Sequence, residues 1–135
     1  MRILYGGIEM NNSRVWIYCR TMQDDSTGPD AIQNQKNRLE QYAKQHGMEI
    51  AGVSSDFQSG LSLDRPGLRE VDKAVQDRLA DIVLVVSMDR LCQKVEDLVG
   101  YWYYLQRYGV RFYTARRGEI KLRIGSVFLK ASDII

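Results

Sequence analysis

Five charged side chains of this sequence could together grip a phosphate group. They follow three apolar segments of the chain and are Arg20, Asp56, Arg65, Asp89 and Arg90. The guanidinium of an arginine donates two parallel hydrogen bonds to a phosphate and stays charged at physiological pH. A carboxylate beside it can orient the guanidinium or carry a proton. Each of these residues alone also fits a surface ion pair or a turn, so their meaning depends on whether the fold brings them together.

The elements that must position these residues alternate between strand and helix patterns. Strands are predicted at 14–18, 48–53, 82–86 and 110–114, and helices at 30–47, 68–79 and 95–109. The uniformly aliphatic segment 82–86 is typical of a strand buried on both faces. The alternation predicts an α/β domain with a doubly wound, mainly parallel sheet of four to five strands and helices on both faces. Because the carboxyl ends of parallel strands meet at one edge, we expect the charged residues to converge there.

Length and composition predict one soluble domain. The chain has 135 residues, of which 44% are hydrophobic and 27% charged, values that are ordinary for globular proteins. Its longest aliphatic segment, 82–86, is far shorter than the ~20 apolar residues of a membrane-spanning helix. Residues 1–13 are interpreted as a tail and lack the pattern of a secretory signal. We therefore expect a cytoplasmic protein that does not contact membranes.

Neither a metal nor a cofactor is expected. Cys19 and Cys92 lie far apart in the sequence and lack the paired spacing of zinc ligands, so we interpret them as reduced thiols. In addition, no glycine-rich phosphate loop follows the first predicted strand.

The charge is unevenly distributed. The net charge is +2, but segment 107–130 holds seven basic residues against one acidic residue, which leaves −4 for the rest of the chain. Such a basic segment is typical of a protein that binds a polyanion, and it is equally typical of a solvated basic hairpin.

Four ordered motifs run through the chain. They are Arg14-Val15-Trp16-Ile17-Tyr18-Cys19-Arg20; Asn34-Gln35; Asp56-Phe57-Gln58-Ser59-Gly60 with Leu63-Asp64-Arg65-Pro66-Gly67-Leu68; and Met88-Asp89-Arg90-Leu91. Over residues 14–130 the chain resembles the catalytic domain of the serine recombinases, the resolvase and invertase family. The resemblance implies a flavodoxin-like catalytic domain over 14–125 that acts on DNA as a dimer and assembles into a tetramer.

The resemblance also implies roles for individual residues. In the family a serine attacks the scissile phosphate to form a phosphoserine link, and arginines hold that phosphate without a metal. Arg20, Arg65 and Arg90 match the phosphate-holding arginines. The supporting residues are matched by Tyr18, Gln35, Asp56, Ser59 and Asp89.

The departures from the family pattern concern the chemistry itself. The opening motif of the family is Tyr, any, Arg, any, Ser, and Met22 stands at the position of the serine. A thioether has no proton to lose and cannot form the phosphodiester link. A family arginine is also replaced, by Gln93. Thr21 and Ser26 are the nearby hydroxyls, but Thr21 is expected to point away from residue 22, because successive side chains of an extended segment alternate. We therefore expect impaired catalysis.

The end of the chain resembles the start of the long helix that follows the sheet in this family, over residues 126–135. The sequence is consistent with a shortened natural protein and with a piece of a longer one. We expect weak binding of this chain alone to the DNA backbone, and either a homodimer or association with an active recombinase.

Two other functions fit the same pattern. One is a flavodoxin-like module that binds a small molecule. The other is a dimerisation module that uses the run of aromatic residues 101–104, since four consecutive aromatics on a helix cannot all face the core.

Overall fold

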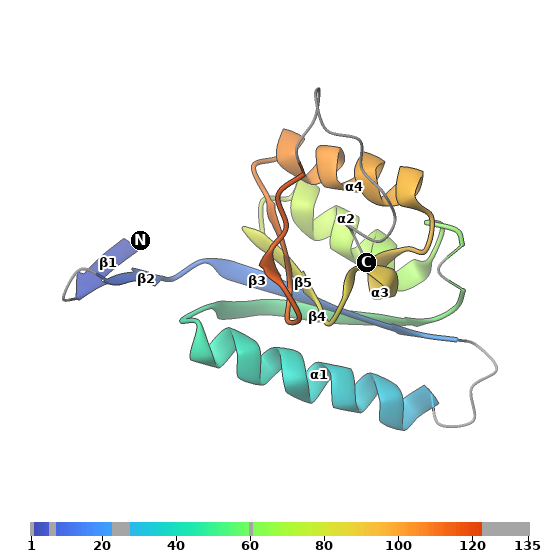
Figure 1. Ribbon diagram of the computed structural model, residues 1–135, viewed down its shortest axis with the longest axis horizontal. Coiled ribbons are helices and arrows are strands. Elements are labelled where there is room, and N and C mark those ends of the chain that lie inside the picture. The colour runs from blue at the N-terminus through green and yellow to red at the C-terminus, as the bar shows by residue number, and fades with distance from the viewer. Residues whose placement is uncertain (1, 6–7, 23–27, 60, 123–135) are drawn as a thin grey trace.

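Strands and helices alternate as predicted. The computed structural model describes residues 2–5, 8–22, 28–59 and 61–122. The main elements are β3 (Arg14–Thr21), α1 (Gly28–Gln45), β4 (Glu49–Phe57), α2 (Pro66–Gln76), β5 (Ile82–Val85), α3 (Met88–Leu91), α4 (Val95–Arg107), β6 (Arg111–Thr114) and β7 (Gly118–Glu119). They form an α/β fold with a five-stranded, mostly parallel sheet, which confirms the predicted fold class (Figure 1).

The strand order determines where a site can form. The order is β4-β3-β5-β6-β7, in which the first four strands are parallel and β7 pairs antiparallel with β6. The chain moves from β3 outward to β4 and then returns to the other side of β3 to form β5. In open α/β sheets, ligands bind where the winding reverses in this way, beyond the carboxyl ends of the strands. That position lies between β3 and β5.

Helices cover both faces of the sheet (Figure 1). Helix α1 packs on one face through Leu39 and Ala43, against an apolar cluster that includes residues of β3 and β5. Helices α2, α3 and α4 cover the other face, where a second cluster joins them to β3, β5 and β6. All four residues of β5 are buried, as its aliphatic sequence predicts for a central strand.

Strand β4 is longer than predicted. The Ser and Asp residues from position 54 onward predict a loop, but β4 pairs with β3 as far as Phe57. The side chains of Ser54 and Asp56 are buried and find partners at the start of α2, where Ser54 donates to the carbonyl of Gly67 over 2.8 Å. Tertiary contacts therefore outweigh the local loop preference.

Helix α4 also differs from its predicted packing. The expected apolar stripe included Trp102, but the buried residues are Leu98, Tyr101 and Leu105. Trp102 is half-buried and donates its indole N–H to the carbonyl of Ile120 over 3.0 Å. The run of aromatics predicts that at least one of them leaves the core. That residue is Tyr103, of which 41% of the surface is exposed.

The first two strands form a small sheet of their own, separate from the main sheet. No strand was predicted within residues 1–13, but β1 (Arg2–Tyr5) and β2 (Ile8–Asn11) form a separate antiparallel pair in which Tyr5 is opposite Ile8. The predicted helix start at 126–135 lies outside the described residues. Within the described residues, every helix is too short or too polar to span a bilayer.

Candidate functional site

Arg20 and the Asp89-Arg90 pair meet where β3 and β5 end. The guanidinium of Arg20 donates to three main-chain carbonyls: that of Asp89 over 2.7 Å, that of Gln58 over 2.9 Å and that of Arg90 over 3.0 Å. Only 2% of the surface of Arg20 is exposed. Burial, and the neighbouring charges of Arg65 and Arg90, lower the pKa of Arg20. Arg20 therefore ties three segments together and has little surface left for a ligand.

Arg65 is also turned inward. Its surface is fully buried, and its guanidinium donates to the carbonyl of Ser62 over 2.8 Å, to the hydroxyl of Tyr18 over 2.8 Å and to the carbonyl of Leu91. Arg65 matches a phosphate-holding arginine in the sequence, whereas in the structure its donors join the start of α2 to β3 and to the end of α3.

Asp56 and Tyr18 form the polar centre beneath this edge. The carboxylate of Asp56 accepts hydrogen bonds from the backbone N–H groups of Gly67, over 2.7 Å, and Leu68, over 3.0 Å. A carboxylate in this place satisfies the free donors at the start of α2. Tyr18 donates to Asp56 over 2.6 Å. Burial and this bond to Asp56 raise the pKa of Tyr18 well above its ordinary value, so the hydroxyl stays protonated.

Gln35 joins α1 to the end of β3. Its side-chain amide accepts from the backbone N–H of Arg20 over 3.1 Å and donates to the carbonyl of Arg20 over 3.0 Å. This two-way pairing extends the hydrogen bonding of the sheet edge through a side chain. Gln35 thus holds the first helix at the site.

An open hollow lies beside Arg90. Its volume is about 250 Å³, and its lining residues are Ala31, Asn34, Gln35, Arg38, Val86 and Arg90. Arg90 is half-buried and donates one hydrogen bond, over 3.2 Å, to the carbonyl of Arg20. Arg38 is exposed, and within the described residues its guanidinium has no partner. Two arginines and two side-chain amides at a sheet edge are suited to an anion.

Sequence reasoning missed Arg38. The available signal was helical spacing, since Arg38 lies three residues after Gln35 and four after Asn34, and residues at these spacings share one face of a helix. The motif Asn34-Gln35 marks this face of the helix in the sequence. That the face lies beside Arg90 depends on where α1 crosses the sheet, which the sequence does not give.

The remaining predicted site residues lie around this edge, and of these Asp89 contacts the buried Arg20 through its main-chain carbonyl. Met22 follows the end of β3 with 46% of its surface exposed, whereas Thr21 beside it is 3% exposed. The side chain of Ser59 is half-buried and accepts from the backbone N–H of Leu61 over 3.1 Å. Asp89 accepts a hydrogen bond from Ser87. Gln93 is exposed, and Ser26 lies outside the described residues.

Comparisons with known proteins agree with this geometry. Residues 15–134 match the family model described as "Resolvase, N terminal domain". The catalytic domain of ISC1926 TnpA, an IS607-like serine recombinase, is 30% identical with a TM-score of 0.70, and the alignment covers 78% of this chain and 71% of that one. The catalytic domain of TP901-1 integrase is 27% identical with a TM-score of 0.67, covering 76% and 77%.

A resolvase family recombinase from Streptococcus pneumoniae has a TM-score of 0.68 at 19% identity, over 79% of this chain and 74% of that one, and shows the likeness of fold alone. The family match spans most of the chain, and the same fold recurs in the catalytic domains of these recombinases. This chain therefore belongs to the resolvase family of serine recombinases.

Proposed function

We propose that this chain holds a phosphate of the DNA backbone but does not cleave the strand. The observation that carries the proposal is the side chain at position 22, which follows β3 two residues after Arg20 and is 46% exposed. Strand cleavage in this family requires an oxygen that attacks phosphorus and later leaves again. A methionine at this exposed place provides no such oxygen.

The adjacent hydroxyl offers no simple substitute. Thr21 is 3% exposed and its methyl side lies toward Gly28, where a Cβ would be 3.4 Å from Cγ2 of Thr21. The side chain of Thr21 is therefore buried, whereas the neighbouring Met22 reaches the surface.

The phosphate contact is assigned to Arg90 and Arg38. Arg20 and Arg65 already donate to main-chain carbonyls and are almost entirely buried. Arg90 and Arg38 line the open hollow, and the exposed Asn34 adds an amide group to it. Backbone contacts of this kind carry no sequence information, so binding should be weak, indifferent to sequence and strongly dependent on salt.

Binding can be tested with a short mixed-sequence DNA duplex, by fluorescence anisotropy at several salt concentrations. Arg90→Gln and Arg38→Gln should each weaken binding and lower the salt slope by about one. Arg78→Gln is the matched control, because it removes the same charge beyond the opposite edge of the sheet, where Arg78 bonds to the carbonyl of Tyr108. An equal loss in all three variants would mean that overall charge, and not the hollow, binds DNA.

Cleavage can be tested by searching for a covalent protein–DNA adduct on supercoiled plasmid under denaturing conditions. We expect no adduct with the natural chain. Met22→Ser should restore at most a small amount, because Gln93 leaves one expected cation missing; Met22→Ser with Gln93→Arg should give more. An adduct formed by the natural chain would contradict the proposal, and Thr21→Val and Ser26→Ala would then identify the nucleophile.

Self-association is a second function favoured by a specific residue. Tyr103 exposes 41% of its surface on α4, between the half-buried Trp102 and Tyr104. Exposed aromatic residues are enriched at protein interfaces. If α4 mediates a dimer, Tyr103→Asp should shift the protein toward monomer in sedimentation velocity while its circular dichroism is unchanged. A natural chain that sediments as a monomer at high concentration would contradict this role.

A further inference from the structure

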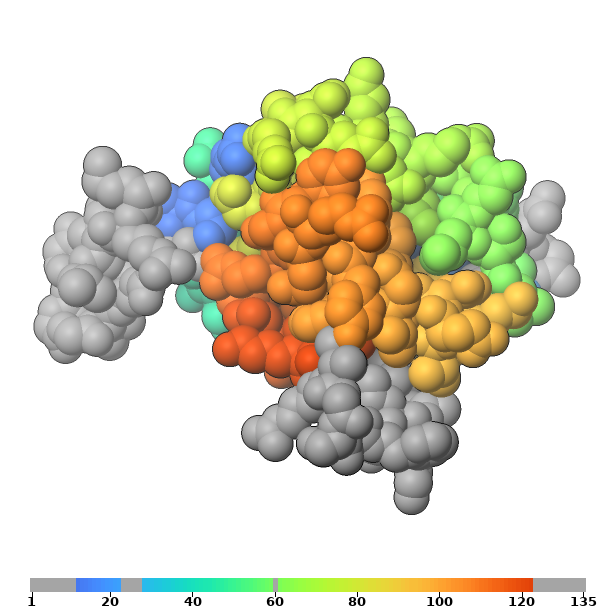
Figure 2. All heavy atoms as spheres, turned by 90° about the horizontal axis from the view of Figure 1, so that it is seen from above, coloured from blue at the N-terminus to red at the C-terminus, as the bar shows by residue number. Residues whose placement is uncertain are grey.

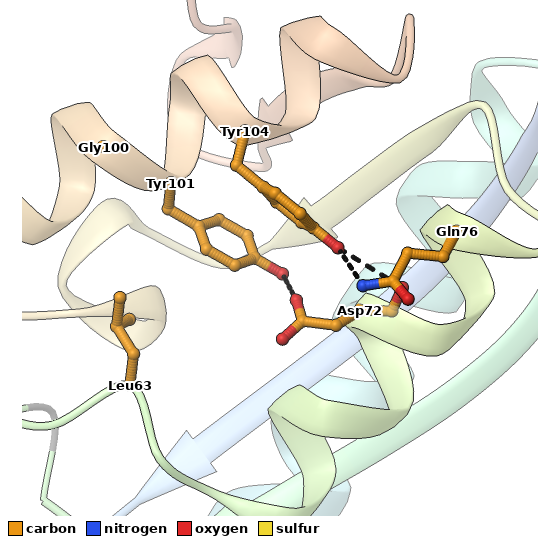
Figure 3. A pocket seen from close by; sticks show the side chains of 6 residues that line it. All are labelled: Leu63, Asp72, Gln76, Gly100, Tyr101 and Tyr104. Atoms are coloured by element: carbon orange, nitrogen blue, oxygen red, sulfur yellow. Dashed lines mark hydrogen bonds between the residues drawn. The ribbon is translucent and has the colours of Figure 1, made fainter.

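A hollow between α2 and α4 lies on the helical face of the molecule and is separate from the hollow beside Arg90. Its volume is about 290 Å³, and its lining residues are Leu63, Asp72, Gln76, Gly100, Tyr101 and Tyr104. Figure 2 looks onto this face, with α4 in orange beside α2 in light green. The close view in Figure 3 shows the Asp72 carboxylate and the two tyrosine rings between the two helices.

The carboxylate of Asp72 is held in place but is only partly satisfied. The buried Tyr101 donates its hydroxyl to Oδ1 over 2.6 Å (Figure 3). Among the described residues no donor contacts Oδ2, and no buried side-chain oxygen is left without a partner, so Oδ2 faces accessible space. Asp72 is half-buried, and this burial raises its pKa although the hydrogen bond from Tyr101 acts in the opposite direction.

The other walls are aromatic and neutral. The rings of Tyr101 and Tyr104 have centroids 5.4 Å apart and planes inclined by 41°. The hydroxyl of Tyr104 accepts a hydrogen bond from the amide of Gln76 over 2.9 Å, which fixes this ring. None of the six lining residues carries a positive charge. The hollow therefore presents one negative charge and two electron-rich ring faces.

Gly100 lines the hollow on the side of α4. A Cβ placed at this position would meet no atom within 4 Å, so space is open above the helix there. Glycine weakens a helix interior relative to alanine. Its presence here leaves access to the ring faces and to Asp72.

We propose that this hollow binds an organic cation, a guanidinium or alkylammonium group, with the charge against Oδ2 of Asp72 and the alkyl stem along the two tyrosine rings and Leu63. A guanidinium or ammonium group satisfies a carboxylate oxygen and is attracted to aromatic faces. A single carboxylate is too few ligands for a divalent metal ion. A neutral apolar ligand would leave Oδ2 of this half-buried carboxylate without a partner.

The chemistry of the site is tested with butylguanidinium and with its neutral analogue butylurea, followed by ¹H–¹⁵N NMR of the whole chain. We expect saturable shifts of the amides of Asp72, Gly100 and Tyr101 with butylguanidinium and at least tenfold weaker binding of butylurea. Equal binding of the two probes, or no shifts at these amides, would overturn the proposal.

Three variants locate the binding. Asp72→Asn keeps the shape and an acceptor for Tyr101 but removes the charge, and it should weaken butylguanidinium binding at least tenfold. Gly100→Leu should block the hollow without a clash, since the position is open and leucine favours helix. Gly100→Ala is the matched control and should bind the probe within about twofold of the natural chain. Unchanged binding in Asp72→Asn or Gly100→Leu would overturn the assignment, and the spectra themselves show whether each variant is folded.

The same cation could be free in solution or could belong to an arginine or lysine side chain of a second copy of this chain. Sedimentation of the natural chain, Asp72→Asn and Gly100→Leu distinguishes the two sources. Association that is lost in both variants assigns the cation to a second copy. A monomeric natural chain, or association that is equal in all three, assigns the site to a free cation and excludes the second copy.

Discussion

The Nη2 atom of Arg20 lies 2.7 Å from the carbonyl oxygen of Asp89, although 69 positions separate the two residues in the chain. This bond joins the end of β3 to the first turn of α3, where the winding of the sheet reverses. The Arg90 side chain returns a bond to the carbonyl of Arg20 over 3.2 Å. One buried arginine thereby positions a second, half-exposed arginine at the edge.

Arg20→Lys should therefore destabilise the fold strongly although it keeps the charge. A lysine ammonium cannot reach the three carbonyls of Gln58, Asp89 and Arg90 that the guanidinium joins. Leaving buried carbonyls unpaired should lower the free energy of unfolding by roughly 3 kcal/mol. Arg90→Lys is the control and should cost less than about 1 kcal/mol, because Arg90 makes one such bond and reaches solvent. Urea denaturation measures both, and equal losses would refute the structural role of Arg20.

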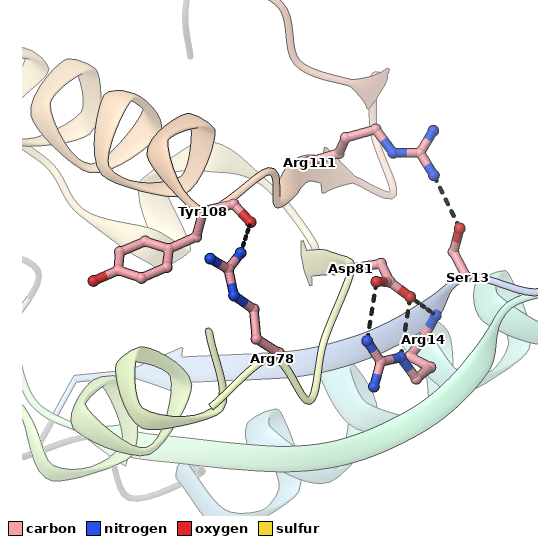
Figure 4. A network of polar contacts seen from close by, with 6 residues as sticks. All are labelled: Ser13, Arg14, Arg78, Asp81, Tyr108 and Arg111. Atoms are coloured by element: carbon pink, nitrogen blue, oxygen red, sulfur yellow. Dashed lines mark hydrogen bonds and ion pairs between the residues drawn. The ribbon is translucent and has the colours of Figure 1, made fainter. Parts of the chain in front are cut away.

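Asp81 should titrate below the ordinary pKa of an aspartate. Arg14 donates to its carboxylate through the backbone N–H over 2.8 Å and through two side-chain nitrogens over 3.2 Å (Figure 4). The hydrogen bonds and charge of Arg14 lower the pKa of Asp81, although burial acts against them. Because the folded pKa is the lower one, this carboxylate stabilises the protein above the ordinary aspartate pKa and loses that contribution as the pH falls through its folded pKa.

The pKa of Asp81 can be followed by NMR. Arg14→Gln should raise it toward the ordinary value, leaving only the backbone bond. Arg111→Gln should raise it much less, because Arg111 acts on Asp81 through charge alone and bonds to Ser13 over 2.9 Å (Figure 4). Equal shifts in both variants would show that the direct bonds of Arg14 do not matter.

The two cysteines should make the protein less stable at alkaline pH. Burial raises the pKa of Cys19 and of Cys92 to about 12. An unfolded cysteine loses its proton near pH 8.5, so above that pH the unfolded chain binds fewer protons and unfolding becomes more favourable. From pH 8 to 9.5 we expect a loss of about 1 kcal/mol per thiol.

This loss can be measured from urea midpoints at the two pH values. The double variant Cys19→Ala, Cys92→Ala should remove most of the difference between them. Ellman's reagent should react slowly with the folded protein and rapidly in denaturant. Fast reaction under native conditions would contradict the burial of these thiols.

Two glycines should respond to alanine in opposite directions. A Cβ at Gly67 would lie 2.4 Å from the carbonyl oxygen of Ser55, which is a backbone atom that cannot move away freely. Gly67→Ala should therefore cost roughly 2 kcal/mol. Gly100→Ala meets no atom within 4 Å and should stabilise α4 by about 0.5 to 1 kcal/mol. Thermal melting of both variants is the measurement, and a Gly67→Ala protein as stable as the natural chain would refute the close approach.

The sequence by itself determined the order of the four parallel strands and the three longer helices, the buried central strand and the family, but not β1, β2, α3 or β7. Alternating strand and helix patterns predict a parallel sheet without knowledge of contacts, because each pattern repeats with the period of its own element. The aliphatic sequence of β5 placed it at the centre, and the short motifs around Arg20, Arg65 and Arg90 identified the resolvase resemblance. Met22 at the serine position was also evident from spacing alone.

Only the tertiary structure decided what each arginine does. Arg20 donates to the carbonyls of residues 58, 89 and 90, and Arg65 donates to those of residues 62 and 91. Most of these carbonyls lie far along the chain from the arginine that bonds to them. No local pattern predicts such a direction, since it depends on where separate loops meet. Arg38 came to the site for the same reason, because α1 crosses the sheet beside Arg90. Likewise, the burial of Tyr101 in place of Trp102 follows from the rotation of α4 against α2, which packing decides and helical periodicity alone leaves open.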